Sequence, residues 1–161
     1  MLGGATVGSL AGCLGSGRSR TPTAAGVPEL ATRAPEPLPA PRVGDPDAPV
    51  TVEVFVDFAC PHCRSFHEET LPRIEGEFVD EGVVGYEHRD FPLPVDDPES
   101  YRAANAARAV QSSEGPGPFF EYVGGLFENQ ADLGLSLYES LADDVGADPE
   151  TVRRAAERRV Y

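Results

Sequence analysis

Two cysteines separated by two residues, Cys60 and Cys63, are the side chains of this sequence best suited to chemistry. They come directly after the apolar run 50–58, and Pro61 and His62 lie between them. A close cysteine pair between a strand and a helix is typical of redox-active thiols. Unpaired N–H groups at the start of the helix favour a Cys60 thiolate, and His62 can add a positive charge or a hydrogen bond to the sulfur. We expect Cys63, one turn further along, to be less exposed and to act as the resolving thiol.

The same cysteines could instead bind a metal ion. Together with His67 and His88 they would supply four ligands of the types that zinc or copper takes. Only one such cysteine pair exists, however, and Pro and His inside the pair are unusual for a zinc site. Haem attachment is excluded, because Arg64 stands where the haem motif requires histidine. A structural disulfide and a redox-inactive, truncated binding module stay open as further alternatives.

The elements around the pair predict a βαβ unit. Alternating β-branched and aromatic residues indicate a buried strand over 50–58, and a helix should run from Cys60 to about Asp80 with a kink at Pro72. A second strand is expected over 83–89. Strand, helix and strand at this spacing form a right-handed unit with parallel strands.

Two acidic residues in the first strand, Glu53 and Asp57, share the face of Phe55. One of them could be a partly buried acid near the cysteines. Two solvated acids at a strand end fit the pattern equally well.

After residue 97 the sequence predicts four helices and no further strand. Their starts are marked by proline or by capping residues, namely Asp97-Pro98, Pro118, the capping box of Ser136 with Glu139, and Asp148-Pro149. Gly115 and Gly146 should end the first and the third.

The N-terminal part predicts export and anchoring. Residues 1–15 form an apolar leader that ends in Leu10-Ala11-Gly12-Cys13, which looks like the site at which exported lipoproteins are cleaved and lipidated on the cysteine. A basic start is absent from the leader, which is also too short to span a membrane. Residues 16–45 are a linker rich in Pro and Ala, and 46–161 form the folded domain, with its helical part at about 98–161. We therefore expect an extracytoplasmic protein attached to the membrane through a lipidated Cys13.

The charge of the sequence argues against one class of partner. Acidic residues outnumber basic ones by 27 to 13, every basic residue is arginine, and the formal net charge is −14. Nucleic-acid binding needs a basic patch, so no nucleic-acid partner is expected. The excess of acid fits a highly soluble surface of the halophilic kind, although a coding bias would explain it as well.

The tetrapeptide from Cys60 to Cys63 resembles the active site of the DsbA-like thiol–disulfide oxidoreductases of the thioredoxin superfamily. Gly44 to Val52 resembles the lead-in to the first strand of that family, and Arg89 to Leu93 resembles the segment after its next strand. The helices that follow resemble the family's helical insertion, so the likeness covers roughly residues 43–161.

The resemblance implies an α/β protein with a thioredoxin-like βαβ core and an inserted or following helical subdomain. It also implies dithiol–disulfide exchange on protein thiols or disulfides, with Cys60 and Cys63 as the redox-active disulfide and His62 as a third catalytic residue. A separate redox partner would restore the pair, no cofactor is implied, and the direction of exchange is left open.

The family continues with a cis-proline loop, two more strands and a final helix, which this sequence does not reach. We therefore expect an incomplete thioredoxin fold, from a sequence clipped at both ends. A partner chain that supplies the missing strands is the alternative.

Overall fold

The structure, a computed structural model, describes residues 37–161. Cys13, the expected leader 1–15 and the linker up to residue 36 lie outside the described residues. Within the described part, no helix is long and apolar enough to cross a membrane.

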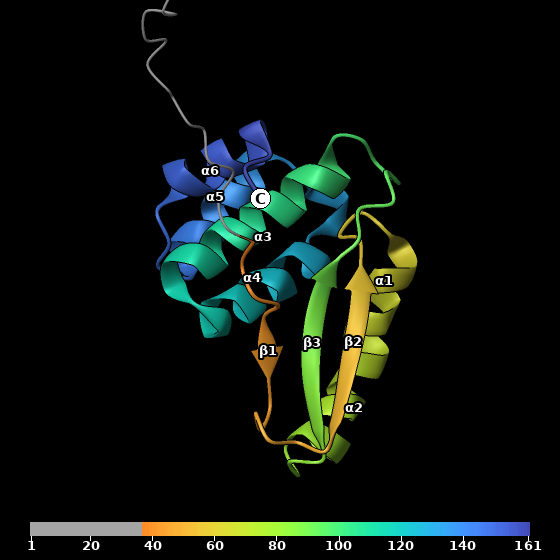
Figure 1. The fold of residues 1–161 in the computed structure, drawn as a ribbon. Coiled ribbons are helices and arrows are strands. Elements are labelled where there is room, and N and C mark those ends of the chain that lie inside the picture. Colours follow the sequence, from red (N-terminus) through yellow and green to blue (C-terminus); the bar gives the residue numbers. More distant parts are fainter. Residues whose placement is uncertain (1–36) are drawn as a thin grey trace, which may run out of the picture. The chain divides into compact units, whose positions relative to one another are not determined.

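A three-stranded sheet carries the redox pair at one end of its edge strand (Figure 1). Strand β2 (Val50–Val56) runs parallel to β3 (Val84–Asp90), with Val50 opposite Val84 and Val56 opposite Asp90. Strand β1 (Arg42–Val43) pairs antiparallel with the other edge of β3, which gives the order β1-β3-β2. The predicted parallel pair is confirmed, and the α/β fold is that expected.

The short strand β1 was not predicted, because it lies in the stretch that the sequence assigns to the linker. Gly44 follows it with φ 94°, and a Cβ there would lie 2.8 Å from the carbonyl oxygen of Val84. Only glycine accepts this conformation and this close approach without strain. Pro41 is buried and accepts a hydrogen bond from the N–H of His88 at 3.0 Å. The folded part therefore begins before residue 46.

The predicted crossover helix is confirmed as one helical run from Pro61 to Val79. It consists of α1 (Pro61–Ser65), the π turn η1 (Phe66–Thr70), α2 (Leu71–Ile74) and a second π turn, η2 (Glu75–Val79). Pro72 has no N–H to donate back along the helix, and the π turn η1 comes directly before its helical turn, with the N–H of Leu71 bonded to the carbonyl of Phe66. The irregularity expected at Pro72 thus takes the form of a π turn.

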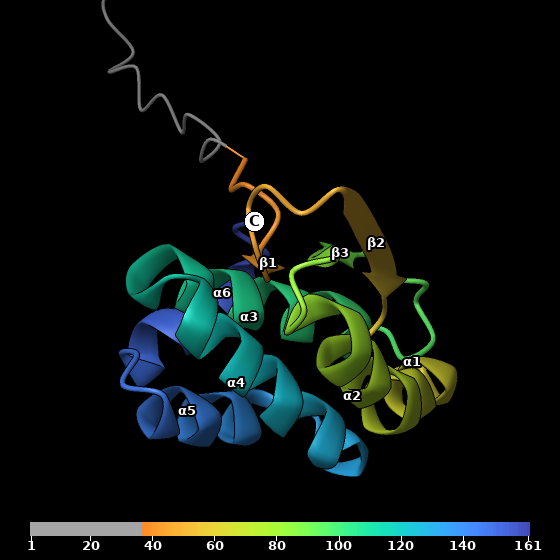
Figure 2. The same cartoon turned by 90° about the horizontal axis from the view of Figure 1, so that it is seen from below.

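Four longer helices follow, as predicted, with a short 3₁₀ turn between the second and the third. They are α3 (Glu99–Glu114), α4 (Pro116–Glu128), η3 (Gln130–Asp132), α5 (Leu135–Asp144) and α6 (Pro149–Arg158). Seen from below, the helices lie to one side of the sheet (Figure 2). Five buried alanines let α3 pack closely in the main core, and they are Ala103, Ala104, Ala106, Ala107 and Ala109.

Two of the predicted helix caps are wrong. The carboxylate of Asp97 pairs with Arg159 at 3.1 Å, and Pro98 takes the N-cap position of α3 instead. Glu139 pairs with Arg153 of α6 at 3.0 Å, and α5 begins after Gly134 without a side-chain cap. In both cases an ion pair to a distant arginine replaces the local hydrogen bond. The predicted cap at Asp148 is confirmed, since it accepts the N–H of Thr151 at 2.7 Å.

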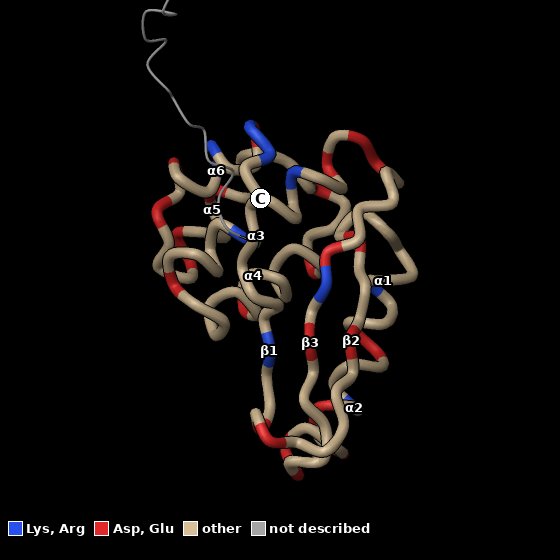
Figure 3. The backbone as a smooth tube through the Cα atoms, viewed as in Figure 1, with Lys and Arg blue, Asp and Glu red and all other residues tan. Residues whose placement is uncertain are grey.

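The two faces of β2 differ sharply. Val54 and Val56 point into the core, whereas Glu53 is exposed and Phe55 keeps 58% of its surface accessible. Phe55 packs edge-on against Phe91 at 6.1 Å on this open face. Acidic residues are spread over strands, helices and loops of the described part, with arginines among them (Figure 3).

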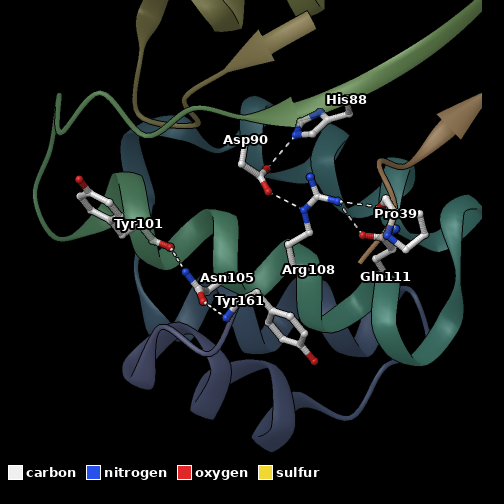
Figure 4. A network of polar contacts seen from close by, with 8 residues as sticks. All are labelled: Pro39, His88, Asp90, Tyr101, Asn105, Arg108, Gln111 and Tyr161. Carbon is white, nitrogen blue, oxygen red and sulfur yellow. Dashed lines mark hydrogen bonds and ion pairs between the residues drawn. The ribbon is translucent and has the colours of Figure 1, made fainter. Parts of the chain in front are cut away.

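A buried polar network joins the end of β3 to α3 and to the chain before β1 (Figure 4). Nε2 of His88 lies 3.0 Å from one carboxylate oxygen of Asp90, and Nε of Arg108 donates to the other. Arg108 also donates to the carbonyl of Pro39 and to the side chain of Gln111. Burial alone would raise the pKa of Asp90, but the contacts with His88 and Arg108 together hold that pKa below its usual value.

Replacing Asp90 with Asn should lower the free energy of unfolding at neutral pH by about 3 kcal/mol, because Arg108 is left buried without its counter-charge. A carboxylate with a depressed pKa stabilises the fold above its unfolded value of 3.8 and loses this effect as the pH falls through the folded value. Chemical denaturation from neutral pH down to about pH 2 should therefore show the difference between wild type and Asp90→Asn shrinking in acid.

Glu150→Gln is a matched control, because Glu150 pairs with Arg154 on the exposed face of α6. This variant should cost less than about 1 kcal/mol. A difference between wild type and Asp90→Asn that stays constant over the whole pH range would contradict the assignment.

Candidate active site

Cys60 occupies the N-cap position of the crossover helix, with φ −83° and ψ 120°, and Pro61 begins the helix. The carbonyl of Cys60 accepts the N–H of Arg64 at 3.1 Å, which is the first helical hydrogen bond. Its own N–H donates to the carbonyl of Asp57 at 3.1 Å, closing a tight turn between β2 and α1. The sulfur is thus attached where the helix leaves N–H groups unpaired, as the sequence predicted.

Cys60 and Cys63 are both free thiols, and both are half-buried. The backbone N–H of Asp57 lies 3.5 Å from the sulfur of Cys63. Burial is the main influence on Cys63 and raises the pKa of its thiol, the N–H of Asp57 opposes this, and the neighbouring Cys60 adds to the increase. Cys63 is therefore held as a neutral thiol, which suits a resolving cysteine.

His62 is exposed and lines a small cavity of about 220 Å³ beside Cys63. The other walls are apolar and come from β2 and the crossover helix, namely Val54, Phe55, Val56 and Phe66. Among the hydrogen bonds of the described residues, none joins the His62 ring to a sulfur. A catalytic role for His62 stays a prediction.

Asp57 is the buried acid that the sequence left undecided. Its side chain is 1% exposed, one oxygen accepts the N–H of Ala59 at 2.8 Å and the other accepts the N–H of Leu93 at 2.6 Å. Glu53, by contrast, is exposed and pairs with Arg89. Asp57 thus connects the turn that carries the cysteines to the loop after β3.

Gln130 is a site residue that sequence reasoning missed. Its side-chain amide, in η3, donates to the carbonyl of Phe58 at 2.7 Å and to that of Cys60 at 3.0 Å. The ring of Phe58 is buried against Phe127 of α4, with centroids 5.2 Å apart. A glutamine 70 residues away from the pair in sequence carries no local signal that would have revealed this contact.

The metal alternative lacks its ligand set. His67 stacks on Phe127 at 4.7 Å, and burial lowers the pKa of its imidazole. His88 is buried, stacks on Phe58 and contacts Asp90. Between residues 37 and 161, no three His, Cys, Asp or Glu side chains come together in a group that could hold a metal ion.

The fold and the cysteine turn define a class of protein that comparison with known families confirms. The family model described as "Thioredoxin" matches residues 38–160, and the chain belongs to this family.

Within the superfamily the chain is DsbA-like. Disulfide bond formation protein D of Bacillus subtilis (strain 168) is 35% identical over 92 residues, which are 57% of this chain and 40% of that protein. The crystal structure of oxidised BdbD from B. subtilis superposes with a TM-score of 0.69 at 30% identity, over 74% of this chain and 66% of the other. DsbA of Chlamydia trachomatis has the same fold, with a TM-score of 0.62 at 23% identity over 74% and 65% of the two chains. The chain spans about two fifths of the length of the curated relative it matches.

Alkylation should distinguish the two thiols. In single variants Cys63→Ser and Cys60→Ser, iodoacetamide should modify the remaining Cys60 faster than the remaining Cys63, because burial raises the pKa of Cys63 and keeps it protonated. The gap should narrow as the pH rises. Mass spectrometry of peptides cut at arginine measures this reaction apart from Cys13, which lies in a different peptide.

Unfolding both variants in denaturant is the control, since it should bring the two rates together. Equal rates in the folded proteins would refute the asymmetry.

Asp57→Ala should lower the free energy of unfolding by roughly 3 kcal/mol, because two N–H groups lose a charged acceptor. Asp57→Asn should recover part of this loss, since its amide oxygen accepts one of the two. Glu53→Gln changes the exposed acid of the same strand and should have an effect of less than about 1 kcal/mol. Chemical denaturation of the three variants measures these effects, and similar losses for Asp57→Ala and Glu53→Gln would contradict the assignment.

Proposed function

We propose that this chain is a protein thiol–disulfide oxidoreductase whose redox-active disulfide forms between Cys60 and Cys63. The observation that carries the proposal is the placement of Cys60 at the N-cap of the crossover helix of a thioredoxin-type βαβ unit, with a second, protonated thiol one turn further in. The names of the relatives, which describe disulfide bond formation, support the same activity.

The exchange needs only thiols and a disulfide. A substrate thiolate attacks the sulfur of Cys60 in the oxidised pair, the Cys60–Cys63 bond breaks, and Cys63 leaves and takes up a proton. A second substrate thiolate then attacks the substrate sulfur of the mixed disulfide, and Cys60 leaves as a thiolate. Two electrons have passed from the substrate dithiol to the pair, and the substrate holds a new disulfide.

The proposed substrates are protein thiols, because the cavity beside Cys63 is open and mostly apolar. Such walls suit a side chain of an unfolded protein. The proposed direction is oxidation, as in the printed name of the B. subtilis relative. A redox partner must then reoxidise the pair, and no cofactor enters the reaction.

The proposed location is outside the cytoplasm, with a membrane anchor on Cys13. The leucine–small–small–cysteine pattern that ends at Cys13 supports this, and the Pro- and Ala-rich stretch after it suits a spacer between the anchor and the domain. His62 is proposed to assist the Cys60 thiolate from its exposed position in the loop.

Oxidation of a reduced, unfolded model protein tests the activity. Wild type, first oxidised in the Cys13→Ser background, should restore disulfides, whereas Cys60→Ser should fall to the uncatalysed rate because it has no sulfur to form the mixed disulfide. Cys63→Ser, mixed with a disulfide substrate, should instead accumulate a mixed disulfide through Cys60. A thiol-trapping gel and substrate activity measure both effects.

Asn129→Ala, a change outside the two cysteines, is the control and should retain activity. Equal rates for wild type and Cys60→Ser would reject the oxidoreductase. A wild-type pair that forms its bridge but never oxidises substrate would support the redox-inactive binding module.

A further inference from the structure

The two carbonyls that frame the nucleophilic cysteine are held from outside its own helix. Cys60 is preceded by Phe58 and Ala59, and the carbonyls of Phe58 and Cys60 both point to the side-chain amide of Gln130. One amide nitrogen has two hydrogens, so each carbonyl receives one of them. The carbonyl of Cys60 already accepts the helical N–H of Arg64, and Gln130 therefore fills its second lone pair.

We infer that Gln130 is a positioning residue that sets the redox equilibrium of the Cys60–Cys63 pair, an inference that rests on the proposed function. Gln130 belongs to η3, after the end of α4, and not to the βαβ unit. It is the hydrogen bond by which the helical part of the chain holds the active-site turn. It touches neither sulfur in the described structure and acts through the two carbonyls.

Other contacts make this position rigid. The Phe58 ring lies between Phe127 of α4 and His88 of β3, with centroids 5.2 and 5.6 Å away. The adjacent Asn129 donates to the carbonyl of Gly125 at 2.9 Å and so closes the end of α4. Gln130 thus extends from a fixed helix end toward a fixed strand end.

The electrostatic effect of Gln130 should differ between the two redox states. Two carbonyl oxygens next to Cys60 carry partial negative charge, which disfavours a thiolate but has little effect on a neutral disulfide. The amide hydrogens of Gln130 offset that charge, and they do so where solvent is partly excluded. Gln130 therefore stabilises the reduced pair more than the oxidised one and makes the disulfide a stronger oxidant.

Gln130→Met tests the inference, because methionine keeps the length of the side chain and removes its donors. In the Cys13→Ser background, the pair is equilibrated with mixtures of reduced and oxidised glutathione, and its thiols are trapped and counted by mass. The equilibrium should shift about three- to tenfold toward the disulfide in Gln130→Met, which is the effect of one or two weakened hydrogen bonds.

Asn129→Ala is the matched control, because it weakens the same helix end without touching the active-site turn. It should leave the glutathione equilibrium at the wild-type value, even where both variants lower the free energy of unfolding. Gln130→Arg, which keeps N–H donors, should stay within about twofold of wild type or shift the opposite way.

Three results would overturn the inference. They are a wild-type equilibrium in Gln130→Met, an equal shift in Asn129→Ala, and a shift toward the disulfide in Gln130→Arg as large as that in Gln130→Met. A wild-type pair that forms no reversible disulfide with glutathione would instead reject the proposed function, and the inference with it.

Discussion

Asp57 accepts two backbone N–H groups with a carboxylate that is 1% exposed, and its own N–H points to the sulfur of Cys63. A buried carboxylate is costly unless both oxygens are hydrogen-bonded, so this residue fixes the ends of two neighbouring strands together. The strand that precedes Cys60 and the loop that follows β3 therefore cannot move independently. The geometry of the redox pair depends on this constraint.

The turn is held from the helical side as well. Gln130 donates to the carbonyls of Phe58 and Cys60, and the aromatic ring of Phe58 is enclosed by Phe127 and His88. Below it, Asp90 and Arg108 join β3 to α3. A pair of thiols whose electronic properties matter is thus placed on backbone that both halves of the domain restrain. Rigid support of this kind is what a site needs when small changes in charge decide an equilibrium.

Much of the fold could be predicted because its signals are local. The alternating residues of 50–56, the cysteine spacing and the proline and glycine punctuation define the βαβ unit and four helices, and the structure confirms them. The short strand β1 was missed, because two residues in a Pro-rich stretch have no period to detect. The caps at Asp97 and Ser136 were wrong, because Asp97 and Glu139 form ion pairs with arginines that lie far away in sequence.

By itself, the sequence determined the chemistry of the pair, its place between strand and helix, and the family to which the chain belongs. These depend on residue types and short spacings, which survive without knowledge of the fold. Only the tertiary structure decided which acid is buried, that the histidines at 67 and 88 pack against aromatic rings, and that Gln130 reaches the cysteine turn. Burial and hydrogen bonding between residues 36 to 72 positions apart are set by how the strands and helices pack, and the local sequence does not encode them.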